Sequence, residues 1–89
     1  MKTIAQMTDD ELKSTLLQLL AEVAPDIEPH TVQPERDFRD QFDFDSMDLF
    51  NYATTIHRAF AVDIPEKDYR QLLSIEKAAE YLRGLLPAR

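Results

Sequence analysis

The sequence has a single glycine, Gly84, and no cysteine among its 89 residues. Tight hairpin turns depend on glycine, so this chain is a poor candidate for a turn-rich β-barrel or β-sandwich. The same scarcity excludes a glycine-rich phosphate loop. The lack of cysteine excludes disulfide bonds, a cysteine nucleophile and a zinc-thiolate site, and it suits a reducing cytoplasm. We therefore expect a fold that is stabilised by side-chain packing alone.

The first helix is predicted over residues 8–23. Thr8 and Glu11 have the spacing of a capping box, and leucines then recur at helical spacing until Pro25 ends the pattern. Residues 24–44 contain three prolines and are predicted to form a long connection. Connections of this length in small domains are usually functional or anchored by their own side chains. The aromatic residues expected to anchor this one are Phe38, Phe42 and Phe44.

Three further helices are predicted in the second half of the chain. The longest runs from residue 46 to about 60, with Asp45 as its N-cap. A short helix with a proline in its first position is expected over residues 65–71. The last helix is expected over residues 75–86, with Ser74 as its cap. Its apolar face is assigned to Ala78, Ala79, Leu82, Leu85 and Leu86.

These elements predict an all-α fold with three main helices and one short helix, packed as a bundle with a long first loop. The length fits a single domain over residues 1–89, with its core between about residues 8 and 86. We expect the chain to be a monomer. The residues expected to pack between the main helices are Leu16, Leu20, Ile56, Phe60 and Leu82.

The charge of the chain restricts its partners. It has 17 acidic and 10 basic residues, a formal net charge of −7. Such a surface repels phosphate backbones and anionic lipids, which argues against nucleic acid and favours basic proteins as partners. No apolar segment approaches the length of a membrane span, and the first residues do not resemble a signal peptide. The expected location is the cytoplasm.

Neither a catalytic centre nor a metal site is predicted. Ser46 and His57 lie on one predicted helix, but they are about 16 Å apart along its axis and cannot form a catalytic pair. Asp43, Asp45 and Asp48 are close in sequence, yet their spacing does not fit a calcium-binding loop. We therefore expect a protein that is not an enzyme and holds no metal.

Ser46 is the residue that stands out. It is expected at the exposed start of a helix, after a long loop, with Asp45 and Asp48 beside it. Free backbone N–H groups at a helix start favour an attached phosphate. Met47 and Phe50 leave apolar surface next to it, which a monomer would normally bury. The alternative is a small acidic interaction domain without a prosthetic group, in which Asp45 and Ser46 only cap the helix.

The segment 42–49, Phe-Asp-Phe-Asp-Ser-Met-Asp-Leu, resembles the Asp-Ser-Leu segment of acyl carrier proteins. The similarity covers about residues 8–86, because the long loop, the Ile-Pro break at residues 64–65 and the Ser-capped last helix follow the layout of that family. It implies that a phosphopantetheinyl transferase attaches 4′-phosphopantetheine to Ser46 through a phosphodiester. The thiol of that arm would hold an acyl group as a thioester and present it to enzymes of fatty acid, lipid or secondary-metabolite synthesis.

The sequence departs from the usual pattern of that family. Asp43 stands where glycine is usual, and Met47 replaces the commonest leucine. Family members of fatty acid synthesis usually have glutamates along the outer face of the second main helix, whereas residues 49–60 contain no acidic residue. This difference suggests a specialised carrier with dedicated enzymes. The residues expected to face partner proteins are Asp43, Asp45, Met47, Asp48, Phe50, Asn51, Thr54, His57 and Arg58.

Overall fold

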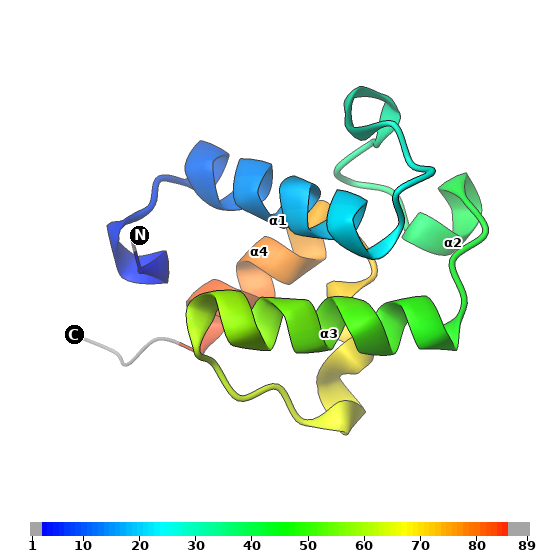
Figure 1. The fold of residues 1–89 in the computed structure, drawn as a ribbon. Helices are drawn as coiled ribbons and strands as arrows, with labels where there is room; N and C mark the ends of the chain where they lie inside the picture. The colour runs from blue at the N-terminus through cyan, green and yellow to red at the C-terminus, as the bar shows by residue number, and fades with distance from the viewer. Residues whose placement is uncertain (1–2, 86–89) are drawn as a thin grey trace.

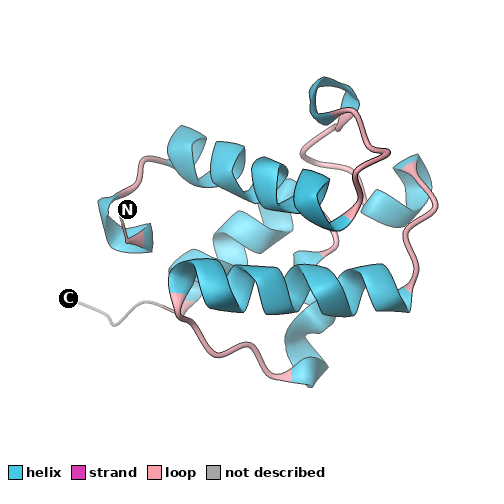
Figure 2. Cartoon of the chain, in the orientation of Figure 1, coloured by secondary structure: helices cyan, strands magenta, loops and turns pink. Residues whose placement is uncertain are grey.

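The computed structural model describes residues 3–85, and every regular element in this range is a helix (Figures 1 and 2). The predicted all-α fold, with three main helices and a long first loop, is confirmed. The main helices are α1 (Asp9–Val23), α3 (Ser46–Phe60) and α4 (Ile75–Gly84). The shorter elements are η1 (Ile4–Gln6), η2 (Pro29–Thr31), α2 (Phe38–Gln41) and η3 (Glu66–Leu72), where η denotes a 3₁₀-helix.

The three main helices form a bundle in which α1 packs against both α3 and α4. α1 and α3 run in opposite directions, and α4 crosses behind them in the view of Figure 1. η3 packs against α3 and α4. α3 begins at the end of the molecule opposite to η1 and to the last turn of α4 (Figure 1). The start of α3 is therefore separated from the region where the described part of the chain begins and ends.

The predicted caps of α1 and α4 are confirmed. The backbone N–H of Glu11 donates to the Thr8 hydroxyl at 3.1 Å, and the Glu11 carboxylate accepts from the Thr8 N–H at 3.0 Å. At α4, the Lys77 N–H donates to the Ser74 hydroxyl at 3.1 Å. Each cap satisfies a backbone donor that has no partner within its helix, and such a cap typically contributes about 1 kcal/mol.

The core lies between α1, α3 and α4. Four of the five predicted core residues are fully buried, and Phe60 is partly buried at its edge. Tyr52 was not among the predicted core residues, although it is fully buried and its hydroxyl donates to the Leu16 carbonyl at 3.0 Å. Burial raises the pKa of the Tyr52 hydroxyl well above its usual value. Leu12, which belongs to the predicted leucine stripe of the first helix, is also fully buried, and the other buried residues outside the prediction are Ile4, Val32, Leu72, Leu73 and Ile75.

The long connection before α3 is more structured than the sequence predicted. It contains η2 and α2. The sequence pattern did not indicate these two elements, because the three prolines of this segment disfavour a helix. The Asp37 carboxylate caps α2, because it accepts from the Arg39 N–H at 2.8 Å. Phe38 is buried, its N–H donates to the Leu73 carbonyl at 2.7 Å, and its ring lies 5.2 Å from that of Phe44 between centroids. The predicted anchoring by Phe38 and Phe44 is thus confirmed, and Phe42 is partly buried beside them.

Two helix boundaries lie one or two residues from the approximate positions that the sequence indicated. Pro65 is the N-cap of η3 rather than its first residue, so this element covers Glu66–Leu72. α4 ends at Gly84, where the Leu85 N–H bonds back to the Leu82 carbonyl at 3.2 Å in a tightened last turn. Leu85 is 41% exposed and does not belong to the buried apolar face of α4. Leu86, which was also assigned to that face, lies outside the described residues.

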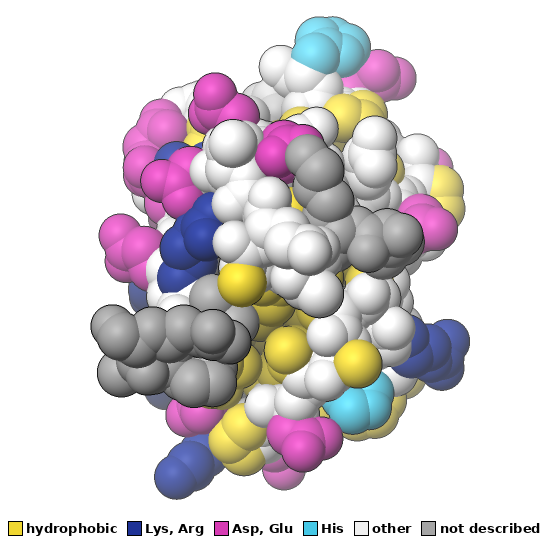
Figure 3. Space-filling view, turned by 90° about the vertical axis from the view of Figure 1, so that its left-hand side faces the viewer, with side chains coloured by type: hydrophobic (Ala, Val, Ile, Leu, Met, Phe, Trp, Pro, Cys, Tyr) yellow, Lys and Arg dark blue, Asp and Glu magenta, His cyan; other side chains and the backbone are white. Residues whose placement is uncertain are grey.

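Arg83 connects α4 to the beginning of the described chain. Its guanidinium donates to the Met7 carbonyl at 2.7 Å, to the Ile4 carbonyl at 3.4 Å and to the Asp9 carboxylate at 2.8 Å. η1 thereby lies against α4, with Ile4 buried. Figure 3 views this end of the molecule and shows hydrophobic side chains near its middle, with charged ones toward the edges. No helix within residues 3–85 has the length and apolar character needed to cross a membrane.

Candidate functional site

Ser46 is the first residue of α3, and it is exposed. The predicted cap at Asp45 is confirmed, because the Asp48 N–H donates to the Asp45 carboxylate at 2.9 Å. The Asp48 carboxylate accepts in return from the Asp45 N–H at 3.2 Å, which completes a capping box. The three-residue spacing of the two aspartates was the signal in the sequence for this pair. The two carboxylates define where α3 begins and hold Ser46 in its first turn.

A cavity of about 240 Å³ lies directly beside Ser46. Its residues come from α2, the loop after it, α3, η3 and the turn before α4. Phe44 and Leu73 are buried and provide an apolar wall, whereas two arginines contribute positive charge. The residues that line the cavity are Arg39, Phe44, Asp45, Ser46, Leu49, Arg70 and Leu73.

The two arginines of this cavity differ in their partners. Arg39 forms a two-pronged pair with Asp37, with Nε and Nη2 at 3.0 Å and 2.8 Å from the two carboxylate oxygens. Its hydrogen bonds hold the pKa of the Asp37 carboxyl below its ordinary value, and Asp37 in turn raises the pKa of Arg39. Arg70 forms no hydrogen bond or ion pair with any residue between 3 and 85. Arg39 is therefore neutralised locally, and Arg70 is not.

The residues that line the cavity beside Ser46 fit a phosphopantetheine group attached at this serine. A phosphodiester carries one negative charge, which the unpaired Arg70 and the N-terminal end of α3 favour. The pantetheine portion has methyl and methylene groups, for which Phe44, Leu49 and Leu73 provide apolar contacts. The geometry at Ser46 is thus compatible with the prosthetic group that the sequence predicted.

The other two serines have different surroundings. Ser74 is 2% exposed, and its hydroxyl is used to cap α4. Ser14 is exposed, but it lies within α1 and not at the start of a helix. Among the three serines of the chain, Ser46 alone combines exposure with a position at a helix start.

Five of the residues expected to face partners lie near Ser46. Met47 and Phe50 are 66% and 49% exposed, and the Phe50 ring lies 6.2 Å from that of Tyr69 on η3. Asp43 is exposed on the loop before α3. Together with the capping residues, this gives a small surface in which acidic groups adjoin apolar ones. We call it the α3-start surface: Asp43, Asp45, Met47, Asp48 and Phe50.

The other expected partner residues lie further along α3. Asn51 is exposed, and the Thr54 hydroxyl donates to the Phe50 carbonyl at 2.9 Å. His57 Nδ1 donates to the Val62 carbonyl at 2.6 Å, so this ring supports the loop after α3. Arg58 is exposed about 18 Å along the helix axis from Ser46. These residues belong to the same helix as Ser46, but the structure does not gather them around it.

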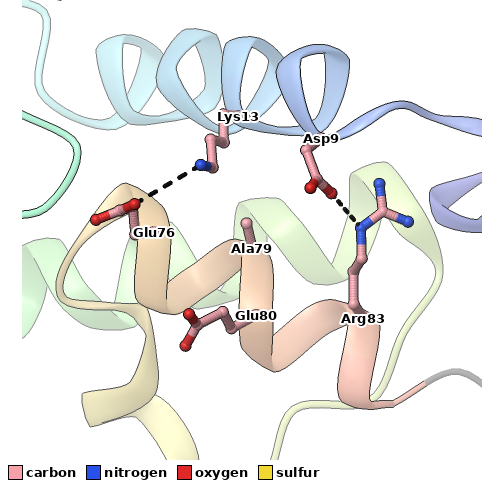
Figure 4. Close-up of a pocket in the computed structure, with 6 residues that line it drawn as sticks. All are labelled: Asp9, Lys13, Glu76, Ala79, Glu80 and Arg83. Carbon is pink, nitrogen blue, oxygen red and sulfur yellow. Dashed lines mark hydrogen bonds and ion pairs between the residues drawn. The ribbon is translucent and has the colours of Figure 1, made fainter.

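A second surface cavity of about 330 Å³ lies between α1 and α4, away from Ser46 (Figure 4). Two ion pairs cross it, Lys13 with Glu76 at 3.8 Å and Arg83 with Asp9 at 2.8 Å. These pairs connect the two helices, which is a structural role. Within residues 3–85, no group of three or more His, Cys, Asp or Glu side chains is arranged to hold a metal ion.

Comparison with known proteins assigns the chain to a family. Residues 14–82 match the family described as a phosphopantetheine attachment site. The chain is 31% identical over 78 residues to the meromycolate extension acyl carrier protein of Mycolicibacterium smegmatis, covering 88% of this chain and 78% of that protein. It is 27% identical over 73 residues to an acyl carrier protein of Rubrobacter xylanophilus, covering 79% of this chain and 90% of that protein. The chain belongs to the acyl carrier protein family, whose prosthetic group is phosphopantetheine.

Proposed function

We propose that Ser46 carries the 4′-phosphopantetheine arm. The observation that carries this proposal is the position of Ser46, an exposed serine at the start of α3 beside a cavity that combines arginines with an apolar wall. Ser46 also lies within the part of the chain that matches the phosphopantetheine family. In the alternative, Asp45 and Ser46 would only cap the helix. The Ser46 side chain is not needed for that cap, because the capping hydrogen bonds join Asp45 and Asp48.

The attachment requires a phosphopantetheinyl transferase and coenzyme A. The Ser46 Oγ forms a bond to the phosphorus that bears the pantetheine, the bond from that phosphorus to the bridging oxygen breaks, and adenosine 3′,5′-bisphosphate leaves. The hydroxyl proton passes to a base of the transferase or to water. The attached arm supplies the terminal thiol that holds an acyl group as a thioester, and the chain itself has no cysteine. In this proposal the chain positions the arm and catalyses no reaction of its own.

The α3-start surface is the proposed contact for the transferase and for acyl-handling enzymes. Its acidic residues attract basic surfaces, which accelerates encounter and orients the complex more than it raises affinity. Met47 and Phe50 are exposed enough to supply apolar contact area. Since Arg58 and His57 occupy the far part of α3, an extended basic partner surface along this helix is disfavoured. This supports a specialised carrier that serves its own set of enzymes, and we propose that it does so in the cytoplasm as a monomer.

Intact mass spectrometry tests the assignment of Ser46. Incubation with coenzyme A and a phosphopantetheinyl transferase is expected to add one phosphopantetheine to the unmodified protein. The S46A variant is expected to gain no mass while retaining its helical circular dichroism, because Asp45 still caps α3. The S14A variant, which alters the other exposed serine, is the matched control and is expected to be modified normally. Modification of folded S46A would overturn the assignment.

A further inference from the structure

Arg70 is a cation on η3 that faces the cavity beside Ser46. It is separated from Ser46 by most of α3 and the following loop in sequence, and the packing of η3 on α3 brings the two residues to one cavity. Its guanidinium has no hydrogen bond or ion pair with the described part of the chain. Arg70 therefore brings to this cavity a positive charge that is not paired with any residue of the described chain.

The other charged groups of the cavity are already engaged. Arg39 is paired with Asp37 by two hydrogen bonds. Asp45 accepts the N–H of Asp48 at 2.9 Å, so its carboxylate is directed to the backbone of its own helix. Arg70 is thus the group that remains available to an anion that enters the cavity.

η3 provides a stable position for Arg70. The Tyr81 hydroxyl of α4 donates to the Asp68 carboxylate of η3 at 2.7 Å. Partial burial together with this hydrogen bond raises the pKa of Tyr81 to about 12, so the hydroxyl remains a donor at neutral pH. Leu72, the last residue of η3, is fully buried. The backbone that carries Arg70 is therefore attached to the bundle at two points.

We propose that Arg70 binds the phosphodiester that joins the arm to Ser46 and thereby fixes the position of this phosphate at the start of α3. The inference rests on the proposed function of Ser46 and adds a ligand for Arg70. The ligand is the single negative charge of the phosphodiester, and the guanidinium is suited to it because its planar N–H groups match phosphate oxygens. Leu49 and Leu73, which line the same cavity, then contact the apolar atoms that follow the phosphate.

The test compares the apo and holo forms of the wild type with those of three variants. R70Q removes the charge, and R70K retains a charge without the planar group. R58Q removes an exposed arginine about 18 Å from Ser46 along α3 and serves as the control. The measurements are the ³¹P chemical shift of the phosphodiester and the holo-minus-apo difference in Tm, each at low salt and in 0.5 M salt. Intact mass first verifies that each holo sample carries one phosphopantetheine, and peptide mapping locates it.

In R70Q we expect a displaced ³¹P resonance and a holo-minus-apo Tm difference that is about 2–4 °C smaller than in the wild type at low salt, the size expected for an exposed ion pair. R70K should retain part of the wild-type holo-minus-apo Tm difference, and R58Q should retain all of it. High salt should reduce this Tm difference in the wild type. Identical resonances and Tm differences in R70Q and wild type would overturn the inference, as would equal effects of R70Q and R58Q. A phosphopantetheine mapped to another residue would instead refute the assignment of Ser46.

Discussion

At the scale of single residues, the acidic side chains around Ser46 have different roles. Asp45 and Asp48 hydrogen-bond to each other's backbone and define the start of α3. Asp43 is exposed, and it forms no hydrogen bond or ion pair with the residues that the structure describes. Substitution of Asp45 or Asp48 would alter the helix cap together with the charge, so Asp43 is the residue at which the effect of charge on partners can be measured alone.

We predict that D43K slows the attachment of phosphopantetheine several-fold at low ionic strength. The reason is that a positive charge beside Ser46 repels the basic surface expected on the transferase, and the effect should fade as salt is added. The rate of mass gain at several salt concentrations measures this. D63K introduces the same charge change on an exposed residue beyond the other end of α3 and should leave the rate nearly unchanged. Equal rates for D43K and wild type at low salt would contradict the role of Asp43.

At the scale of elements, α3 ends without a glycine. Ala61 follows its last residue in the left-handed conformation, with φ of 54°. The Cβ of alanine makes this conformation unfavourable by about 1–2 kcal/mol. The hydrogen bond from His57 Nδ1 to the Val62 carbonyl stabilises the chain directly after this turn. The end of α3 therefore contains local strain that the surrounding contacts offset.

We predict that A61G stabilises the protein by about 0.5–1 kcal/mol. Glycine removes the steric strain of the left-handed conformation, and the benefit is reduced by the greater entropy of glycine in the unfolded chain. Urea denaturation followed by circular dichroism measures the change. A59G, two residues earlier within α3, is the control and should destabilise the protein by about 1 kcal/mol, because its backbone is helical. A destabilised A61G variant would show that the turn is not strained.

At the scale of the whole molecule, the three main helices depend on one shared core. Leu16 and Leu20 of α1, Ile56 of α3 and Leu82 of α4 are fully buried. The described chain has a radius of gyration of 12.2 Å, so this core is small. Small domains have total stabilities of only about 5–15 kcal/mol. A single cavity in the core therefore removes a large fraction of the stability.

We predict that L20A or I56A lowers the free energy of unfolding by about 2–5 kcal/mol, the usual cost of a cavity at a fully buried position. Chemical denaturation of each variant against the wild type measures the loss. L85A, at a residue that is 41% exposed, should change the stability by less than about 0.5 kcal/mol. A loss below about 0.5 kcal/mol in both core variants would show that the core has been assigned to the wrong faces.

The sequence alone determined the features that depend on neighbouring residues. The caps at Thr8, Asp45 and Ser74 and the start of α3 at Ser46 were predicted correctly, because capping is an interaction over three residues. Helical periodicity likewise identified the buried residues Leu16, Leu20, Ile56 and Leu82 of the main helices. The acyl carrier family was recognised from the segment around Ser46. The assignments of Ser46 and of the partner-facing residues remain predictions for the experiments above.

The tertiary structure alone decided which distant residues meet. Nothing near Arg70 in the sequence indicates that it shares a cavity with Ser46, because the packing of η3 against α3 creates that proximity. The buried Tyr52 hydroxyl donates to the Leu16 carbonyl on another helix, a partner that no local pattern reveals. α2 formed within a segment that its prolines suggested to be irregular, because the bond of Phe38 to Leu73 and its aromatic neighbours stabilise it there. These contacts depend on how the helices pack, and packing is a property of the folded chain as a whole.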